Sequence, residues 1–143
     1  MAKLRKLTHI AFAVKSIDGA LPVFQNLLAA TVLLQPFTPS DRQHRVIILS
    51  VAGIVIELME PIDENGFLAR FLAKKGEGFN HIGFDVEDIK GASEVLRSKG
   101  IEIFRERVNY SGLKYAFIHP KTFFGIESHL EEDWMTLDDL ETV

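Results

Sequence analysis

Cysteine is absent from this 143-residue sequence, and aromatic residues other than phenylalanine are scarce, with one tryptophan and two tyrosines. Without cysteine the chain cannot form a disulfide, a thiolate metal site or a cysteine nucleophile. Any metal ion that it binds must therefore be held by histidine, aspartate, glutamate or water. Five histidines are present for such a role.

The sequence also lacks a strong charge bias and a long apolar run. Its net charge is −4, and its 16 lysines and arginines are scattered, so no basic patch indicates nucleic-acid binding. No apolar run approaches the roughly 18–20 residues that span a bilayer. The first six residues are too short and too charged for a signal peptide. We expect a soluble cytoplasmic protein that binds neither nucleic acid nor membrane.

Apolar residues, by contrast, are plentiful, at 47% of the sequence. A chain of this length has the usual size of one domain, and it buries roughly 68–70% of its extended surface on folding. The composition predicts a single domain over residues 1–143 with a core that needs no covalent staples.

A repeat with an offset of 72 residues organises the chain. Residues 7–24 aligned with 79–96 give eight identities in eighteen positions. The identical pairs include His9 with His81 and Gly19 with Gly91. We interpret the repeat as an internal duplication of one structural module.

Each copy predicts the order strand, helix, strand, strand, strand. An alternating strand opens each copy, Ser16 and Asp88 stand at helix N-cap positions, and Gly100 suits the C′ position of the second helix. The predicted helices are 17–28 and 89–99, and the predicted strands are 9–14, 31–34, 45–51, 54–59, 81–86, 101–104, 115–119 and 126–130.

These elements form two modules, at about 6–60 and about 79–132, joined by a linker at about 61–78 that contains a short amphipathic helix over 67–75. One module cannot bury both faces of its sheet, whereas two modules related by a pseudo-twofold can. The predicted fold class is α+β. Two tandem βαβββ modules form a pseudo-twofold, partly closed eight-stranded sheet around a central cavity.

Two pairs of polar residues at the repeat offset interrupt apolar strands. His9 and His81 open the first strand of each copy, and Glu57 and His129 lie on the last strand of each copy. An ionised carboxylate in so apolar a strand must be exposed, paired or bound to a cation. Because equivalent positions face each other across a pseudo-twofold axis, the four residues predict one metal site.

Three imidazoles and one carboxylate suit Zn, Co, Ni, Fe or Mn. Four protein ligands leave a six-coordinate metal with two open positions, which can chelate two neighbouring oxygens of a substrate. A metal in that position acts as a Lewis acid and stabilises an enolate.

These residues lie in motifs that resemble the vicinal-oxygen-chelate superfamily of glyoxalases, extradiol dioxygenases and fosfomycin- and bleomycin-resistance proteins. Within it, the likeness is to the methylmalonyl-CoA epimerases and covers roughly residues 6–132. The motifs are THIAFAVKSIDGALPVF at 8–24, VIELMEP at 55–61, FLAKKGEGFNHIGFDVEDI at 71–89 and AFIHPK at 116–121.

The resemblance implies that His9, Glu57 and His81 are metal ligands. The fourth family ligand is a glutamate that also serves as a base, and His129 stands in its place. Some epimerases carry a second acidic residue where this chain has Val46. A metal-bound neutral imidazole is a poor proton acceptor, so the base must be another residue. Glu127 shares a strand face with His129 and His44 shares one with Val46, so both are candidate catalytic bases.

Three functions follow from the resemblance. The first is a metal-dependent isomerase that moves an α-proton of an acyl-CoA thioester or a similar small acid. The second is a glyoxalase-like lyase or an Fe(II) dioxygenase of the same superfamily. The third is a ligand-binding or resistance protein without catalysis. Family members are commonly homodimers, so we expect a homodimer with a small-molecule substrate.

Overall fold

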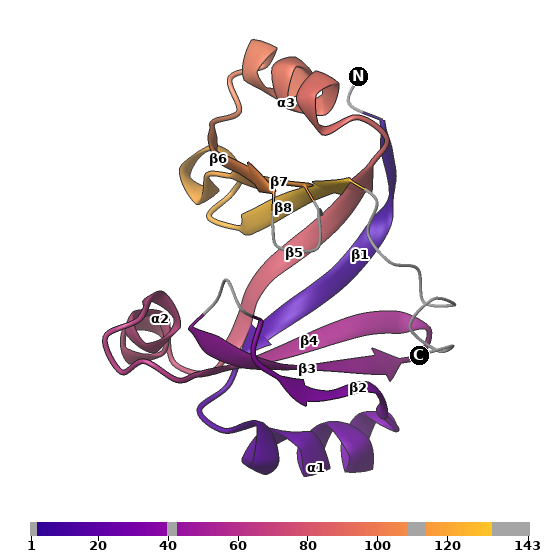
Figure 1. The fold of residues 1–143 in the computed structure, drawn as a ribbon, viewed down its shortest axis with the longest axis vertical. Coiled ribbons are helices and arrows are strands. Elements are labelled where there is room, and N and C mark those ends of the chain that lie inside the picture. Colours follow the sequence, from indigo (N-terminus) through magenta and orange to yellow (C-terminus); the bar gives the residue numbers. More distant parts are fainter. Residues whose placement is uncertain (1–2, 40–42, 109–113, 133–143) are drawn as a thin grey trace. The chain divides into compact units, whose positions relative to one another are not determined.

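The computed structural model describes residues 3–39, 43–108 and 114–132, and Figure 1 traces them in sequence colours. The strands and helices follow one another as β1 Leu4–Ala13, α1 Ile17–Leu28, β2 Thr31–Phe37, β3 His44–Val51, β4 Ile54–Pro61, α2 Phe67–Lys75, β5 Gly78–Val86, α3 Ile89–Ser98, β6 Ile103–Val108, β7 Lys114–Ile118 and β8 Glu127–Glu132, with a short 3₁₀ turn, η1, at Pro120–Thr122 before β8.

The described residues form two compact units. The first unit comprises residues 3–9 and 81–132, and the second comprises residues 10–80, with the gaps given above. The strands β1 and β5 therefore each contribute residues to both units. The single domain over 1–143 and its module boundaries stay a prediction.

The strands are ordered β2-β3-β4-β1-β5-β8-β7-β6 in one open sheet. Parallel pairing recurs with the repeat offset: Ala11 on β1 is opposite Glu57 on β4, and Gly83 on β5 is opposite His129 on β8. The α+β class and the βαβββ order of each module are confirmed, but the predicted partial closure is wrong, because β2 and β6 stand at the two ends of the strand order among the described residues. Because the register recurs as well, the duplication seen in the sequence is a duplication of structure.

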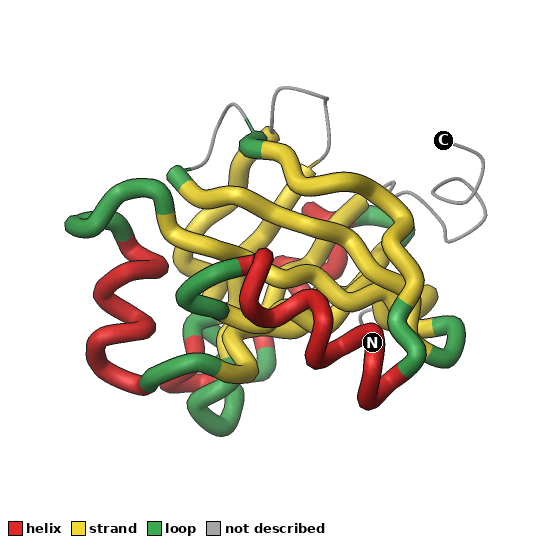
Figure 2. Tube along the Cα trace, turned by 90° about the horizontal axis from the view of Figure 1, so that it is seen from below, coloured by secondary structure: helices red, strands yellow, loops and turns green. Residues whose placement is uncertain are grey.

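In the second unit, both faces of β3 are buried. Val46 and Ile48 belong to one apolar cluster, which α2 covers with Leu68. Ile47 and Leu49 belong to another cluster, which α1 covers with Ile17. Since successive side chains on a strand point to opposite faces, the two helices cover opposite faces of this part of the sheet. Figure 2 shows α1 as a red helix lying along yellow strands.

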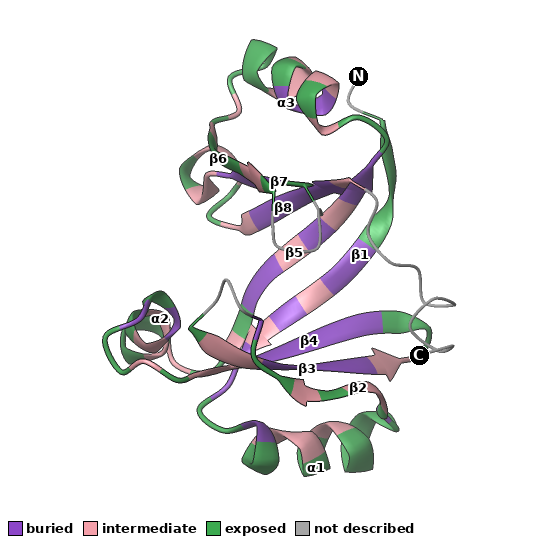
Figure 3. Cartoon of the chain, viewed as in Figure 1, coloured by how far each residue is buried: buried purple, intermediate pink, exposed green. Residues whose placement is uncertain are grey.

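The first unit has a smaller core between α3 and the strands β5, β7 and β8. Val86, Ala92, Ala116, Ile118 and Leu130 form it, all at most 5% exposed. The burial is concentrated in the strands, as the purple segments of β5 and β8 show in Figure 3. Among the described residues, no helix is long and apolar enough to cross a membrane.

The first helix of each module begins at the predicted N-cap. Ser16 Oγ accepts a hydrogen bond from the Gly19 N–H at 3.2 Å, and Asp88 Oδ1 accepts one from the Lys90 N–H at 3.1 Å. Gly100 has a left-handed φ of 82° just after α3, which confirms its C′ role because glycine adopts this conformation at little cost.

A second helix-starting contact also follows the repeat. Glu60 Oε2 accepts from the Ile17 N–H at 2.7 Å, and Glu132 Oε2 accepts from the Ile89 N–H at 2.8 Å. Each carboxylate comes from the last strand of its own module and satisfies a helix N–H that has no partner within the helix. This pair also has the repeat offset, but the sequence analysis did not single it out.

The observed bounds of every strand differ from the predicted ones by at least one residue, and the differences are largest in two strands. The strand predicted at 101–104 runs from Ile103 to Val108, and the strand predicted at 9–14 begins at Leu4. The added residues are mostly exposed and include Arg105, Glu106 and Arg107. Pairing with β7 extends β6, which a search for apolar alternation could not detect.

Candidate metal centre

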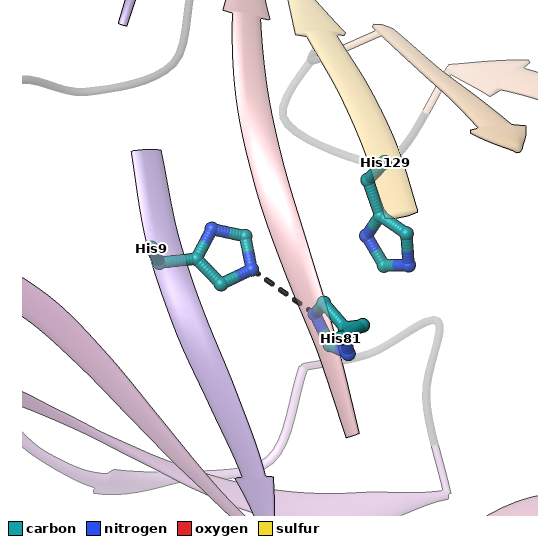
Figure 4. A group of neighbouring side chains, drawn as sticks. All are labelled: His9, His81 and His129. Atoms are coloured by element: carbon teal, nitrogen blue, oxygen red, sulfur yellow. Dashed lines mark hydrogen bonds between the residues drawn. The ribbon is translucent and has the colours of Figure 1, made fainter. Parts of the chain in front are cut away.

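Three of the predicted ligands converge in the first unit. His9 lies on β1, His81 on β5 and His129 on β8, and their candidate ligand nitrogens all lie within 4.8 Å of one another. In the β5–β8 register, His81 is opposite Glu127, so His129 is two residues further along on the same side of β8. Figure 4 shows the three imidazoles gathered from three strands.

The closest pair is His9 and His81. Their Nε2 atoms are 3.0 Å apart, and the rings meet edge to face at 87°. The ring of His129 stacks on that of His81, with centroids 4.1 Å apart and planes inclined by 19°. Phe117 covers His129 from β7, with ring centroids 4.3 Å apart.

The cluster is buried: His9, His81 and His129 are 2%, 3% and 5% exposed. Gathering three imidazoles away from water is costly unless each finds a partner. The Nε2 atoms of His9 and His81 are within hydrogen-bond distance of each other at 3.0 Å, and the three rings offer ligand nitrogens that all lie within 4.8 Å of one another. This donor set fits a borderline divalent metal, because such metals prefer imidazole nitrogen.

Carboxylates flank the cluster on β8. Glu127 is half-buried, and its Oε1 is 3.7 Å from His129 Nε2. Glu131 is 1% exposed, and its Oε2 is 3.7 Å from His9 Nδ1, while its Oε1 is 4.0 Å from His129 Nδ1. Of the two predicted bases, Glu127 thus lies beside the three histidines.

The sequence analysis missed Glu131 and Thr8 as parts of this centre. Thr8 is 4% exposed, and its hydroxyl donates to Glu131 Oε2 at 2.7 Å. Alternation along β8 would have pointed to Glu131, because Glu127, His129 and Glu131 share one face of a strand whose neighbours are buried. Nothing comparable in the local pattern marks Thr8.

The remaining predicted residues belong to the second unit. Glu57 is 3% exposed on β4, opposite Ile48 of β3, and Val46 is 1% exposed. His44 opens β3 opposite Pro61 and is half-buried. Glu57 as the fourth ligand and His44 as a base both stay predictions.

Comparison with known proteins places this arrangement in a family. A model of the glyoxalase/bleomycin resistance protein/dioxygenase superfamily matches residues 8–117. The chain is 32% identical over 131 residues to the ethylmalonyl-CoA/methylmalonyl-CoA epimerase of Cereibacter sphaeroides, covering 89% of this chain and 97% of that protein. It is 30% identical over 132 residues to the mitochondrial methylmalonyl-CoA epimerase of Homo sapiens, covering 90% and 74%.

The fold agrees with a solved structure as well. The crystal structure of methylmalonyl-CoA epimerase from Mycobacterium tuberculosis matches with a TM-score of 0.81 and 28% identity, covering 94% of this chain and 92% of that one. The family model matches most of the chain, and the βαβββ module is duplicated in the structure. The chain therefore belongs to the glyoxalase/bleomycin resistance protein/dioxygenase superfamily.

Proposed function

We propose that this protein is a metal-dependent epimerase that moves the α-proton of a small acyl-CoA thioester. The observation that carries the proposal is the buried group of three histidines, His9, His81 and His129, in a chain 32% identical to an ethylmalonyl-CoA/methylmalonyl-CoA epimerase. The substrate class is inferred from that relative and from the human epimerase, which the chain also resembles over most of its length.

The three histidines would hold a divalent metal ion, with Glu57 as the proposed fourth ligand. Neutral imidazole together with carboxylate favours Zn, Co, Ni, Fe or Mn. Bound there, the metal would act as a Lewis acid toward the thioester carbonyl and so make the α-proton easier to remove.

Glu127 is the residue that we propose moves the proton. It is half-buried, and its Oε1 lies 3.7 Å from His129 Nε2, beside the proposed metal ligands. Its carboxylate would take the α-proton from one face of the carbon, and a second acid–base group would donate a proton to the opposite face. His44 is the proposed second base, because inversion is simplest with one acid–base group on each face.

The test is exchange of solvent deuterium into the α-position of methylmalonyl-CoA. Metal-loaded protein should catalyse exchange, and protein stripped of metal should not. Glu127→Gln should slow the exchange at least about 100-fold, because general acid–base catalysis contributes about 10²–10⁴. Glu106→Gln makes the same change at an exposed position of β6 and should leave the rate unchanged.

Two results would count against the proposal. One is metal-loaded protein that exchanges no deuterium above the metal-free sample, which would remove the epimerase assignment. The other is a Glu127→Gln variant with wild-type exchange, which would leave the reaction in place but assign the base to another residue.

A further inference from the structure

The Nδ1 side of His9 faces a buried hydrogen-bonded chain that the proposed reaction does not use. Thr8 Oγ1 lies 2.9 Å from His9 Nδ1 and donates to Glu131 Oε2 at 2.7 Å. All three residues are buried, at 4%, 2% and 1% exposure for Thr8, His9 and Glu131. They connect β1 to β8 within the first unit.

The number of protons available to the hydrogen bonds among Thr8, His9 and Glu131 determines the tautomer of His9. A threonine hydroxyl has one proton to donate, and Thr8 donates it to the Glu131 carboxylate. At 2.9 Å from His9 Nδ1, the Thr8 oxygen must then act as the acceptor. On this count His9 Nδ1 carries the ring proton, and His9 Nε2 is the acceptor in its 3.0 Å hydrogen bond with His81 Nε2.

The glycine on β5 makes room for this chain. A Cβ atom at Gly83 would lie 2.3 Å from Thr8 Oγ1, 2.5 Å from His9 Cε1 and 2.7 Å from His9 Nδ1. Atoms cannot approach so closely, so only glycine lets Thr8 and the His9 ring lie against the β5 backbone. The hydrogen-bonded residues Thr8, His9 and Glu131, which we call the relay, therefore depend on the glycine at position 83.

We propose that Glu131, acting through Thr8, is a positioning residue that holds His9 in the Nδ1-protonated tautomer, so that Nε2 faces the metal. The inference rests on the proposed metal centre but not on the proposed reaction. Histidine ligands commonly donate their second ring N–H to an oxygen acceptor, and loss of such a partner typically costs 10–100-fold in metal affinity. Glu131 also lies near Nδ1 of His129, at 4.0 Å.

The first experiment reads the tautomer directly in metal-free protein. Long-range ¹H–¹⁵N correlation spectra of labelled imidazoles distinguish a protonated Nδ1 from a protonated Nε2. Wild-type His9 should be protonated at Nδ1. A wild-type His9 protonated at Nε2 would overturn the proposal, whether or not any metal binds and whether or not the protein is an epimerase.

The second experiment measures Zn²⁺ and Co²⁺ affinity by calorimetry. Thr8→Val removes the hydroxyl and should weaken binding about 10–100-fold. Glu131→Gln should weaken it as much, because the new amide can donate to Thr8 and so reverse the direction of the hydrogen bonds. Thr8→Ser keeps the hydroxyl and should retain affinity within about threefold. Thr31→Val makes the same change at an exposed position of β2 and should have no effect.

The outcomes separate this inference from the proposed function. If Thr8→Val, Thr8→Ser and Glu131→Gln all bind metal as wild type does, the relay has no positioning role. If affinity falls as expected but wild-type protein exchanges no α-deuterium, the relay stands and the epimerase assignment falls. Should Thr8→Val fail to fold, the metal affinity of Glu131→Gln and the wild-type spectra still decide the question.

Discussion

At the scale of single residues, the two modules place different chemistry at equivalent positions. Glu57 in the first copy corresponds to His129 in the second. The carboxylate that the family resemblance implies at position 129 is absent, yet Glu127 and Glu131 lie two residues to either side on the same strand face. Carboxyl groups therefore remain beside the histidines, but two residues away from the ligand position.

Gly83→Ala tests the closest packing at the centre. The new Cβ would overlap Thr8 and the His9 ring, each at less than 3 Å, and overpacking of this kind typically costs about 1–3 kcal/mol. We expect a loss of unfolding free energy in that range by chemical denaturation, together with weaker metal binding. A Gly83→Ala variant as stable as wild type would mean that His9 and Thr8 do not lie against β5 as described.

At the scale of elements, α1 and α3 begin with similar N-caps but differ in the space around the glycine in their first turn. A Cβ at Gly19 would meet Ser16 at an ordinary 3.8 Å, whereas a Cβ at Gly91 would lie 2.4 Å from Asp88 Oδ2. Asp88 is the N-cap of α3, so it cannot move away without weakening its bond to the Lys90 N–H. The two repeats thus offer a matched pair of glycine substitutions.

Gly19→Ala should stabilise the protein by about 0.5–1 kcal/mol, the usual helix preference for alanine over glycine. Gly91→Ala should give a smaller gain in unfolding free energy, or a loss, because disturbing the Asp88 N-cap costs about 1 kcal/mol. Denaturant unfolding of both variants measures the difference. Equal gains at the two positions would contradict the cap geometry of α3.

The contact of Glu132 with Lys114 and Ile89 gives α3 a dependence on pH. The hydrogen bond from Lys114, followed by that from the Ile89 N–H, lowers the pKa of Glu132 below its ordinary value. A lowered pKa means that the folded state favours the carboxylate, so the stabilisation is fully present above the unfolded-state pKa. It is lost as the pH falls through the lowered folded-state pKa.

Lys114→Met should raise the pKa of Glu132 and flatten the acid side of the stability profile. At neutral pH the loss should be below about 1 kcal/mol, since the pair lies near the surface. Carbon-detected NMR titration of the Glu132 carboxyl reads the pKa, and unfolding between neutral and acidic pH reads the stability. Lys74→Met changes an exposed lysine of α2 and is the control, which should not shift the pKa of Glu132. A shifted Glu132 pKa in Lys74→Met, or an unshifted one in Lys114→Met, would contradict the assigned cause.

At the scale of the whole molecule, a metal ion that binds only the folded chain adds its binding free energy to stability. At a free metal concentration 100 times Kd, the gain is about 2.7 kcal/mol. For a chain of this size, that should raise Tm by about 10 °C. Thermal scans with and without Zn²⁺ or Co²⁺ measure the shift.

The histidines provide the controls for this measurement. His81→Gln should abolish most of the shift, because it removes a ligand from the centre of the cluster. His119→Gln makes the same change at a histidine that caps η1, and it should keep the shift even if its own Tm is lower. A shift that survives His81→Gln would place the bound metal elsewhere.

Much of the fold could be predicted from the sequence because the pattern of one βαβββ module occurs in it twice. The helices α1 and α2, the caps at Ser16 and Asp88 and the order of the elements depend on local spacing and capping. Edge strand β6 and the start of β1 were less predictable, since both carry exposed charged residues and β6 is extended by pairing with β7.

The same division applies to the candidate site. From the repeat alone, His9 and His81 are equivalent positions and His129 is equivalent to Glu57, and this symmetry is what grouped the three histidines in one predicted site. Only the tertiary structure placed Glu131 from β8 and Thr8 from β1 at the Nδ1 side of His9. The reason is physical: residues 123 positions apart become hydrogen-bonded partners through strand register and packing, and no local pattern encodes that distance.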